Sequence, residues 1–338
     1  MVLWSEPVNN ELIVEWLFVN SGPILRYRIA VDLMEVSNRK KERLFQESLA
    51  TPEAQRWISN LNKAQNIHGS KDTDAENPLA KLLEYGFNRA HPAFDKKVKD
   101  LLNTTLQAWD HFVLLPYLLR AGYADHPTIS EWLKRRIDTL YNTAQLGSFD
   151  FYLNPAETKD LPKAWQGKPI YRDEFGHQAG YALPTCYDFY ALAYCSGIPG
   201  IIDLPSKCET IVSFLSDPRF QATIGGYGWD RNKKRCYAAG RVFLACVEPA
   251  RLVLFLNLGA GFHAARKAQW FHQGIAALES YRTSRDTFCF PSNLLIERTG
   301  NHMYGGSHMG LGENRRSPQA LELESTFHML TIQKRLKN

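Results

Sequence analysis

The sequence predicts an all-α protein, either an α/α toroid or a strongly curved solenoid of helical hairpins. Apolar residues recur at helical spacing along most of the chain, and no convincing alternating pattern of the strand type is present. Helices with one polar face also alternate with helices that are apolar throughout. An α/α solenoid produces this alternation because its outer helices contact water and its inner helices are buried.

The first helix is predicted over residues 10–20, where the apolar side chains share one face. These side chains are Leu12, Ile13, Trp16, Leu17 and Val19. Ser21-Gly22-Pro23 ends this helix and starts the next, because proline is favoured in a first turn. Further helices are predicted over 23–34, 39–48, 52–64, 78–87, 92–103, 106–122, 128–144, 184–197, 205–216, 233–247, 250–262, 265–282 and 317–335.

Some of these helices repeat one another. Segments 91–102 and 126–137 both begin with His-Pro and continue with a basic outer face and apolar residues at matching positions. We therefore expect one helical-repeat domain over residues 1–338, in which 66–338 form the toroid and 1–65 form a helical layer that caps it.

Two of the predicted helices end in a related pattern, LNKAQNIHGS at 61–70 and LYNTAQLGSFDF at 140–151. This pattern resembles a degenerate QW motif of the α/α-toroid superfamily of terpene cyclases and protein prenyltransferases. The segment SGPILRYRIAVDLM at 21–34 also resembles the opening helix of prenyltransferase-repeat proteins. The tryptophan of the motif and the DxDD signature of proton-initiated cyclases are absent. The resemblance implies a toroid with a central, aromatic-lined cavity and an enzyme of the cyclase or transferase type.

Composition and charge restrict the class of protein. The chain has 338 residues, of which 44% are hydrophobic and 22% charged, as in ordinary globular proteins. The net charge of +5 is modest, so a nucleic-acid partner is not expected. The six cysteines form no C-x-x-C pair, which favours buried free thiols and a cytoplasmic location. No apolar stretch is long enough to predict a membrane span.

Three polar segments of the second half, 171–190, 224–235 and 299–318, precede apolar helices. In a closed ring of hairpins, such loops would converge at one mouth of the cavity. The predicted catalytic residues are His302, Tyr304, His308, Glu313, His177 and Asp230. The predicted substrate-binding residues are Asn301, Arg315, Arg316, Glu174, Tyr181, Tyr187, Tyr227 and Trp229.

These residues suit acid–base chemistry on a small organic substrate, since imidazole, phenol and carboxyl groups can transfer protons near neutral pH. Arg315 and Arg316, at a predicted helix start, would hold the anionic group of the substrate. The substrate itself is expected to be an anionic or isoprenoid-like small molecule. Asn301, His302 and Tyr304 also resemble the site of toroidal polyuronate lyases, which leaves a lyase or hydrolase of acidic sugars as an alternative.

Two further readings stay open. His177 and His308, with Glu174 and Glu313, could bind a divalent metal, although no known ligand spacing is present and no cofactor is assigned. A non-catalytic helical-repeat protein would instead bind a partner through its outer basic faces. Those faces carry Lys96, Lys97, Lys134, Arg135 and Arg136.

Overall fold

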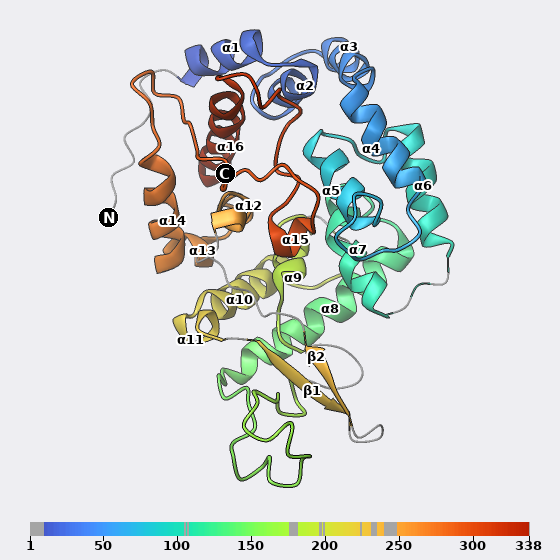
Figure 1. Ribbon diagram of the computed structural model, residues 1–338, viewed down its shortest axis with the longest axis vertical. Coiled ribbons are helices and arrows are strands. Elements are labelled where there is room, and N and C mark those ends of the chain that lie inside the picture. The colour runs from blue at the N-terminus through green and yellow to red at the C-terminus, as the bar shows by residue number, and fades with distance from the viewer. Residues whose placement is uncertain are drawn as a thin grey trace.

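The computed structural model confirms an all-α fold. It describes residues 10–104, 106, 108–175, 182–195, 198, 200–223, 225–230, 235–239 and 249–337. Within these ranges the chain forms sixteen helices and one two-stranded hairpin (Figure 1).

The helices follow one another from α1 to α16, with the hairpin between α11 and α12. Their bounds are α1 (Asn10–Asn20), α2 (Pro23–Asp32), α3 (Asn38–Leu49), α4 (Pro52–Asn62), α5 (Glu76–Glu84), α6 (Pro92–Leu102), α7 (Ala108–Arg120), α8 (Pro127–Leu146), α9 (Cys186–Leu192), α10 (Leu204–Ser216), α11 (Pro218–Gln221), α12 (Pro249–Gly259), α13 (His263–Lys267), α14 (Gln269–Glu279), α15 (His302–Gly305) and α16 (Ala320–Lys337).

Most predicted helices are present, and their starts have local causes. The Thr51 hydroxyl accepts a hydrogen bond from the Ala54 backbone N–H at the start of α4, where Pro52 occupies the first turn. At the end of α8, Gly147 takes the left-handed conformation that closes many helices. The tail of the second QW-like segment is therefore a helix terminus.

Two predictions of secondary structure were wrong. The segment predicted as a helix over 233–247 contains strand β2 (Arg235–Ala239), which pairs antiparallel with β1 (Gly226–Asp230). The helix predicted over 265–282 is divided into α13 and α14, because Ala268 between them has extended backbone angles.

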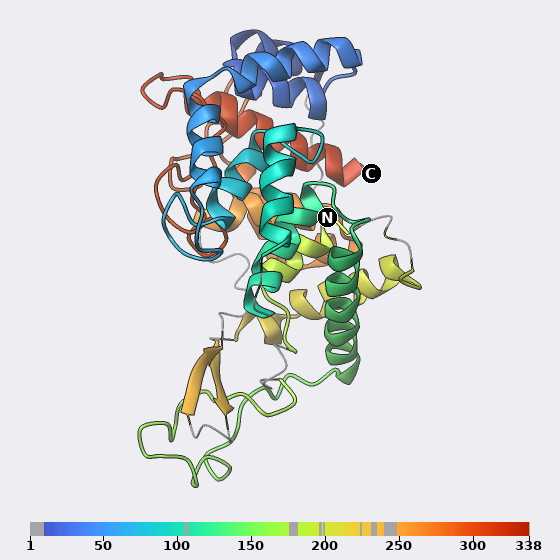
Figure 2. The same cartoon turned by 90° about the vertical axis from the view of Figure 1, so that its right-hand side faces the viewer.

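A short segment of the chain lies in the middle of the helices. Figure 1 shows α15 with α5, α7, α9, α12 and α16 around it, and α15 contacts α5, α9 and α12 directly. Helices α1 to α4 lie along one end of the molecule in both views, whereas the β hairpin and the coil before it project from the other end (Figure 2). This arrangement agrees with inner and outer helices, while a closed toroid stays a prediction.

Helix α5 differs from an ordinary amphipathic helix because every one of its residues is buried. Its charged residues Glu76, Lys81 and Glu84 are 5% exposed or less. Buried charges cost free energy unless they are paired and hydrogen-bonded. The partners that the rest of the chain supplies to α5 therefore show where the polar centre of the molecule lies.

The outer basic faces are only partly as predicted. Lys134 and Arg135 are exposed on α8, but the Arg136 guanidinium donates to both carboxylate oxygens of Asp188, at 2.6 and 2.8 Å. Arg136 therefore links α8 to α9 and belongs to the interior.

The cysteines are partly as predicted. Cys186, Cys195 and Cys208 are buried free thiols, whereas Cys289 is exposed.

Candidate functional site

The sequence predicts that the glycine-rich segment 299–312 is a loop at the mouth of a cavity. In the structure this segment enters the core instead. The Asn301 side chain caps α15 by accepting the Tyr304 backbone N–H at 2.8 Å. Gly306 then adopts φ +60°, and its α-carbon lies so close to the Ala250 carbonyl of α12 that a side chain would overlap it. Glycine is needed here because only a residue without Cβ fits both the conformation and the contact.

One cavity on this segment holds three of the predicted site residues, His308, Glu313 and Arg315. We call it the acidic pocket. Its volume is about 480 Å³, within the range of small-molecule sites. The carboxylates that line it are Glu53, Asp72, Glu297, Glu313 and Glu324, and its arginines are Arg56, Arg298 and Arg315.

Two of these carboxylates, Glu297 and Glu324, are held by consecutive backbone N–H groups. Gly310 N–H donates to Glu297 Oε2 at 2.8 Å, and Leu311 N–H donates to Glu324 Oε1 at 2.7 Å. The fully buried Lys81 ammonium of α5 donates to Glu297 Oε2 at 2.6 Å and to the Gly310 carbonyl at 2.6 Å. Arg315 forms an ion pair with Glu324.

The surroundings displace the pKa values of these two carboxyl groups in opposite directions. Burial raises the pKa of Glu324 to about 7, although Arg315 acts against this. Burial acts the same way on Glu297, but the Lys81 ammonium outweighs it and holds the Glu297 pKa below its usual value. Near neutral pH, Glu297 is ionised and Glu324 is close to half protonated.

The surroundings of His308 and Glu313, which are also predicted site residues in the acidic pocket, shift their pKa values too. His308 is 1% exposed, its Nε2 lies 2.8 Å from the Gly300 carbonyl oxygen, and burial lowers its pKa. Glu313 Oε1 accepts the Gly22 backbone N–H at 2.7 Å, and burial raises its pKa. His308 is therefore neutral near pH 7, and Glu313 ties the pocket to the start of α2.

A second polar cluster lies at the start of α5, and it contains three other predicted residues, Tyr187, Asn301 and Tyr304. We call it the Glu76 cluster. The buried Glu76 carboxylate accepts Tyr187 Oη–H at 2.6 Å and the Asn301 amide N–H, and His68 Nδ1 lies 2.8 Å from it. Tyr304 packs edge-on against His68 and Tyr187.

The two titratable partners of Glu76 respond differently. The hydrogen bond that His68 donates to the Glu76 carboxylate raises the pKa of His68, whose side chain is 33% exposed. Burial raises the pKa of Tyr187 well above its usual value, which keeps the phenol protonated. The cluster thus combines a buried carboxylate, a partly exposed imidazole and a phenolic proton donor.

His302 does not reach either site as a catalyst. Its side chain is fully buried, its Nδ1 lies 3.4 Å from the Tyr117 hydroxyl, and it packs against Tyr190. Burial lowers its pKa to about 3. The structure therefore gives this histidine a packing position in the core.

The remaining predicted residues lie elsewhere. Tyr227 and Trp229 are on β1, with Asp230 at its end, in the projecting part seen in Figure 2. β1 pairs with β2, and the Tyr171 backbone N–H donates to the Tyr227 carbonyl at 2.9 Å. Glu174 and Arg316 are exposed. His177 and Tyr181 lie outside the described residues.

The sequence alone did not identify Lys81, Glu297, Glu76, His68 or Glu324 as site residues. One signal was available, since ENPLAKLLE at 76–84 places three charged residues and Asn77 among apolar ones. Charged residues are almost never fully buried unless they are paired, so those that a buried helix carries have specific partners.

Comparison with known proteins gave no matching family model, no matching curated protein and no matching solved structure. Among the described residues, no three His, Cys, Asp or Glu side chains are grouped so that they could hold a metal ion. The described helices also include none that is long and apolar enough to cross a membrane.

Proposed function

We propose that this protein is an enzyme that performs acid–base chemistry on a small hydroxylated substrate in the acidic pocket. The observation that carries the proposal is the pair Glu297 and Glu324, which are fixed on adjacent backbone N–H groups and have pKa values displaced in opposite directions. Environments that separate the pKa values of two carboxyl groups are typical of an acid and its ionised partner.

The two carboxyl groups would have different roles. Glu324, with a pKa of about 7, can donate a proton to a leaving oxygen at neutral pH. Glu297 stays ionised beside Lys81 and would stabilise positive charge or accept a proton from water. This division of roles suits hydrolysis or elimination at a carbon–oxygen bond.

The lining of the pocket favours a neutral or cationic substrate. Five carboxylates outnumber three arginines in it, and Arg315 is already paired with Glu324. Trp57 and Tyr85 are its only aromatic lining residues among those described, so a large isoprenoid is a poorer fit than a polar molecule. The acidic pocket therefore supports the isoprenoid-like or anionic substrate suggested by the sequence less well than a neutral or cationic one.

The first test needs no substrate. The pKa of Glu324, measured by carbon-13 NMR of the labelled side chain, is expected near 7 in the wild type. Lys81→Met should raise the pKa of Glu297, since the ammonium that lowers it is removed. An ordinary carboxyl pKa for Glu324 would remove the basis of the proposal.

The second test is catalytic. Chromogenic glycosides of neutral, amino and uronic sugars are incubated with wild type, Glu324→Gln and the exposed control Glu35→Gln. We expect neutral or amino sugars to be cleaved, with a rate that falls as the pH rises through about 7. The rate of cleavage should be lower by roughly 10²-fold or more in Glu324→Gln, and it should be unchanged in the control variant. Full activity of Glu324→Gln would contradict the assignment.

The Glu76 cluster favours one other function, elimination from an acidic sugar. Asn301, Tyr187 and His68 converge on one buried carboxylate, and the exposed His68 ring would serve as the base. Incubation with polygalacturonate and alginate, followed by ultraviolet absorbance of the unsaturated product, tests it. Activity that is lost in His68→Asn but retained in Glu324→Gln would favour this function over the first.

A further inference from the structure

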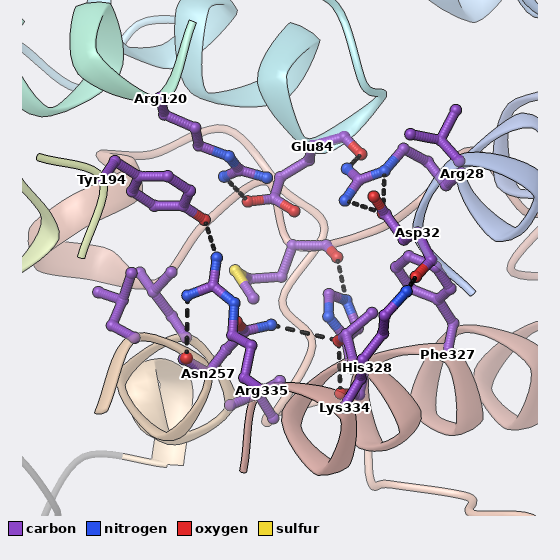
Figure 3. Close-up of a pocket in the computed structure, with 16 residues that line it drawn as sticks. Arg28, Asp32, Glu84, Arg120, Tyr194, Asn257, Phe327, His328, Lys334 and Arg335 are labelled. Atoms are coloured by element: carbon purple, nitrogen blue, oxygen red, sulfur yellow. Dashed lines mark hydrogen bonds and ion pairs between the residues drawn. The ribbon is translucent and has the colours of Figure 1, made fainter. Parts of the chain in front are cut away.

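A second cavity lies on the other side of the segment that enters the core. It has a volume of about 310 Å³, and it is lined by the last turns of several helices (Figure 3). Glu84 ends α5, Arg120 ends α7, and Arg335 is in the last turn of α16. Arg28 and Asp32 come from α2. We call this cavity the basic pocket.

The basic pocket and the acidic pocket share a wall of three consecutive residues. His308 and Gly310 line the acidic pocket, whereas Met309 lines the basic pocket. Next to this wall, His328 Nε2 lies 3.3 Å from the Met309 carbonyl oxygen, and burial lowers its pKa to about 4. His328 is therefore neutral near pH 7 and adds no charge to the basic pocket.

The basic pocket has an excess of positive charge. Four cationic side chains line it, Arg28, Arg120, Lys334 and Arg335, against the carboxylates of Asp32 and Glu84. Each carboxylate is already paired, Asp32 with Arg28 at 2.6 Å and Glu84 with Arg120. Arg28 and Arg120 also donate to the Leu83 carbonyl, each at 3.2 Å, so both hold the end of α5.

Within the described part of the chain, the other two cations have only neutral oxygen partners. Arg335 donates to the Tyr194 hydroxyl at 3.0 Å and to the Asn257 carbonyl at 3.2 Å, and it lies over the Tyr194 ring (Figure 3). Lys334 donates to the Asp32 carbonyl at 2.6 Å. A guanidinium has five N–H donors and an ammonium three, so both groups keep donors for a ligand.

We propose that the basic pocket binds a small oxyanion, a phosphate group or a compact dicarboxylate, between Lys334 and Arg335. Two positive charges that have no carboxylate partner among the described residues match the charge of such a dianion. Arg335 is held in place by Tyr194 and Asn257, which lowers the entropy lost when it binds a ligand. The site does not depend on the proposed catalysis, because the two pockets have no lining residue in common.

The test is isothermal titration calorimetry of the full chain with inorganic phosphate and with succinate, at constant ionic strength set by sodium chloride. The wild type should bind one of the two anions with Kd below about 1 mM. Phosphate binding alone assigns a phosphate site, and succinate binding alone assigns a dicarboxylate site.

Three variants test whether the anion binds at Lys334 and Arg335. Lys334→Gln and Arg335→Gln should each weaken binding by tenfold or more, as expected for a lost charged hydrogen bond. Lys337→Gln is the matched control, because it removes an exposed cation of the same helix that does not line the pocket. Lys334 is exposed, so its variant should fold even if Arg335→Gln does not. Absence of binding to the wild type, or equal binding by Lys334→Gln, would overturn the proposal.

Discussion

Substitution of Gly306 by alanine tests whether segment 299–312 is packed inside the core. Gly306 has φ +60°, and a Cβ there would overlap the carbonyl group of Ala250 in α12. The chain offers a matched control, since Gly147 has φ +62° and no atom lies within 4 Å of the place that its Cβ would occupy. The two substitutions impose the same backbone conformation on alanine and differ only in the space around it.

The expected decrease in the free energy of unfolding has two parts, one from the backbone conformation and one from the space around the added Cβ. Placing alanine in the left-handed region costs about 1–2 kcal/mol at either position. At Gly306, overpacking against the α12 backbone adds about 1–3 kcal/mol. We therefore expect Gly147→Ala to lower the free energy of unfolding by about 1–2 kcal/mol and Gly306→Ala to lower it by about 2–5 kcal/mol.

The assay is urea denaturation followed by both circular dichroism and tryptophan fluorescence, so that coincidence of the two curves checks for a two-state transition. Equal decreases in the free energy of unfolding of the two variants would mean that Gly306 has open space around it. In that case the segment would not pack against α12, and the division of the interior into two pockets would be incorrect.

Two other predictions concern the buried charges. Lys81→Met should lower the free energy of unfolding by about 1–3 kcal/mol, since the Glu297 carboxylate, whose side chain is 25% exposed, loses its ammonium partner. The double variant Lys81→Met/Glu297→Gln should recover part of this loss in the same urea assay, and additive losses would contradict the pairing. The raised pKa of Glu324 means that its stabilising contribution is full below the ordinary value of 4.5 and is lost as the pH rises through about 7. Between pH 5 and pH 8, the free energy of unfolding should therefore fall by roughly 2–3 kcal/mol less in Glu324→Gln than in the wild type. If the free energy of unfolding changed with pH in the same way in both proteins, the raised pKa of Glu324 would be refuted.

The helices were predictable because their causes are local. Apolar spacing, Pro52 in a first turn and Gly147 at a helix end are all visible in the sequence. The β hairpin was not, because GYGWD and RCYAA are short and contain glycine and charged residues at strand positions. Short strands that are stabilised mainly by pairing with each other leave little periodic signal.

The candidate site was only partly predictable, because inward and outward polar segments look alike in sequence. Glycine, histidine and tyrosine in 299–312 are typical of a surface loop, yet glycine also lets a backbone enter a tightly packed core. His302 is buried, whereas His308 lies in a pocket, and nothing local distinguishes the two. The partners Lys81 and Glu76 come from a helix far away in sequence, so only the fold brings them to the site.

The distance in sequence between these partners has a consequence for biosynthesis. Lys81 and Glu297 are 216 residues apart, and Glu76 and Asn301 are 225 residues apart. On the ribosome, Lys81 therefore emerges long before its partner Glu297, and this part of the interior can be completed only after segment 297–301 has emerged. Native contacts of such long range slow folding. A nascent or truncated chain that ends before Glu297 is expected to stay partly unfolded and to depend on chaperones until it is completed or degraded.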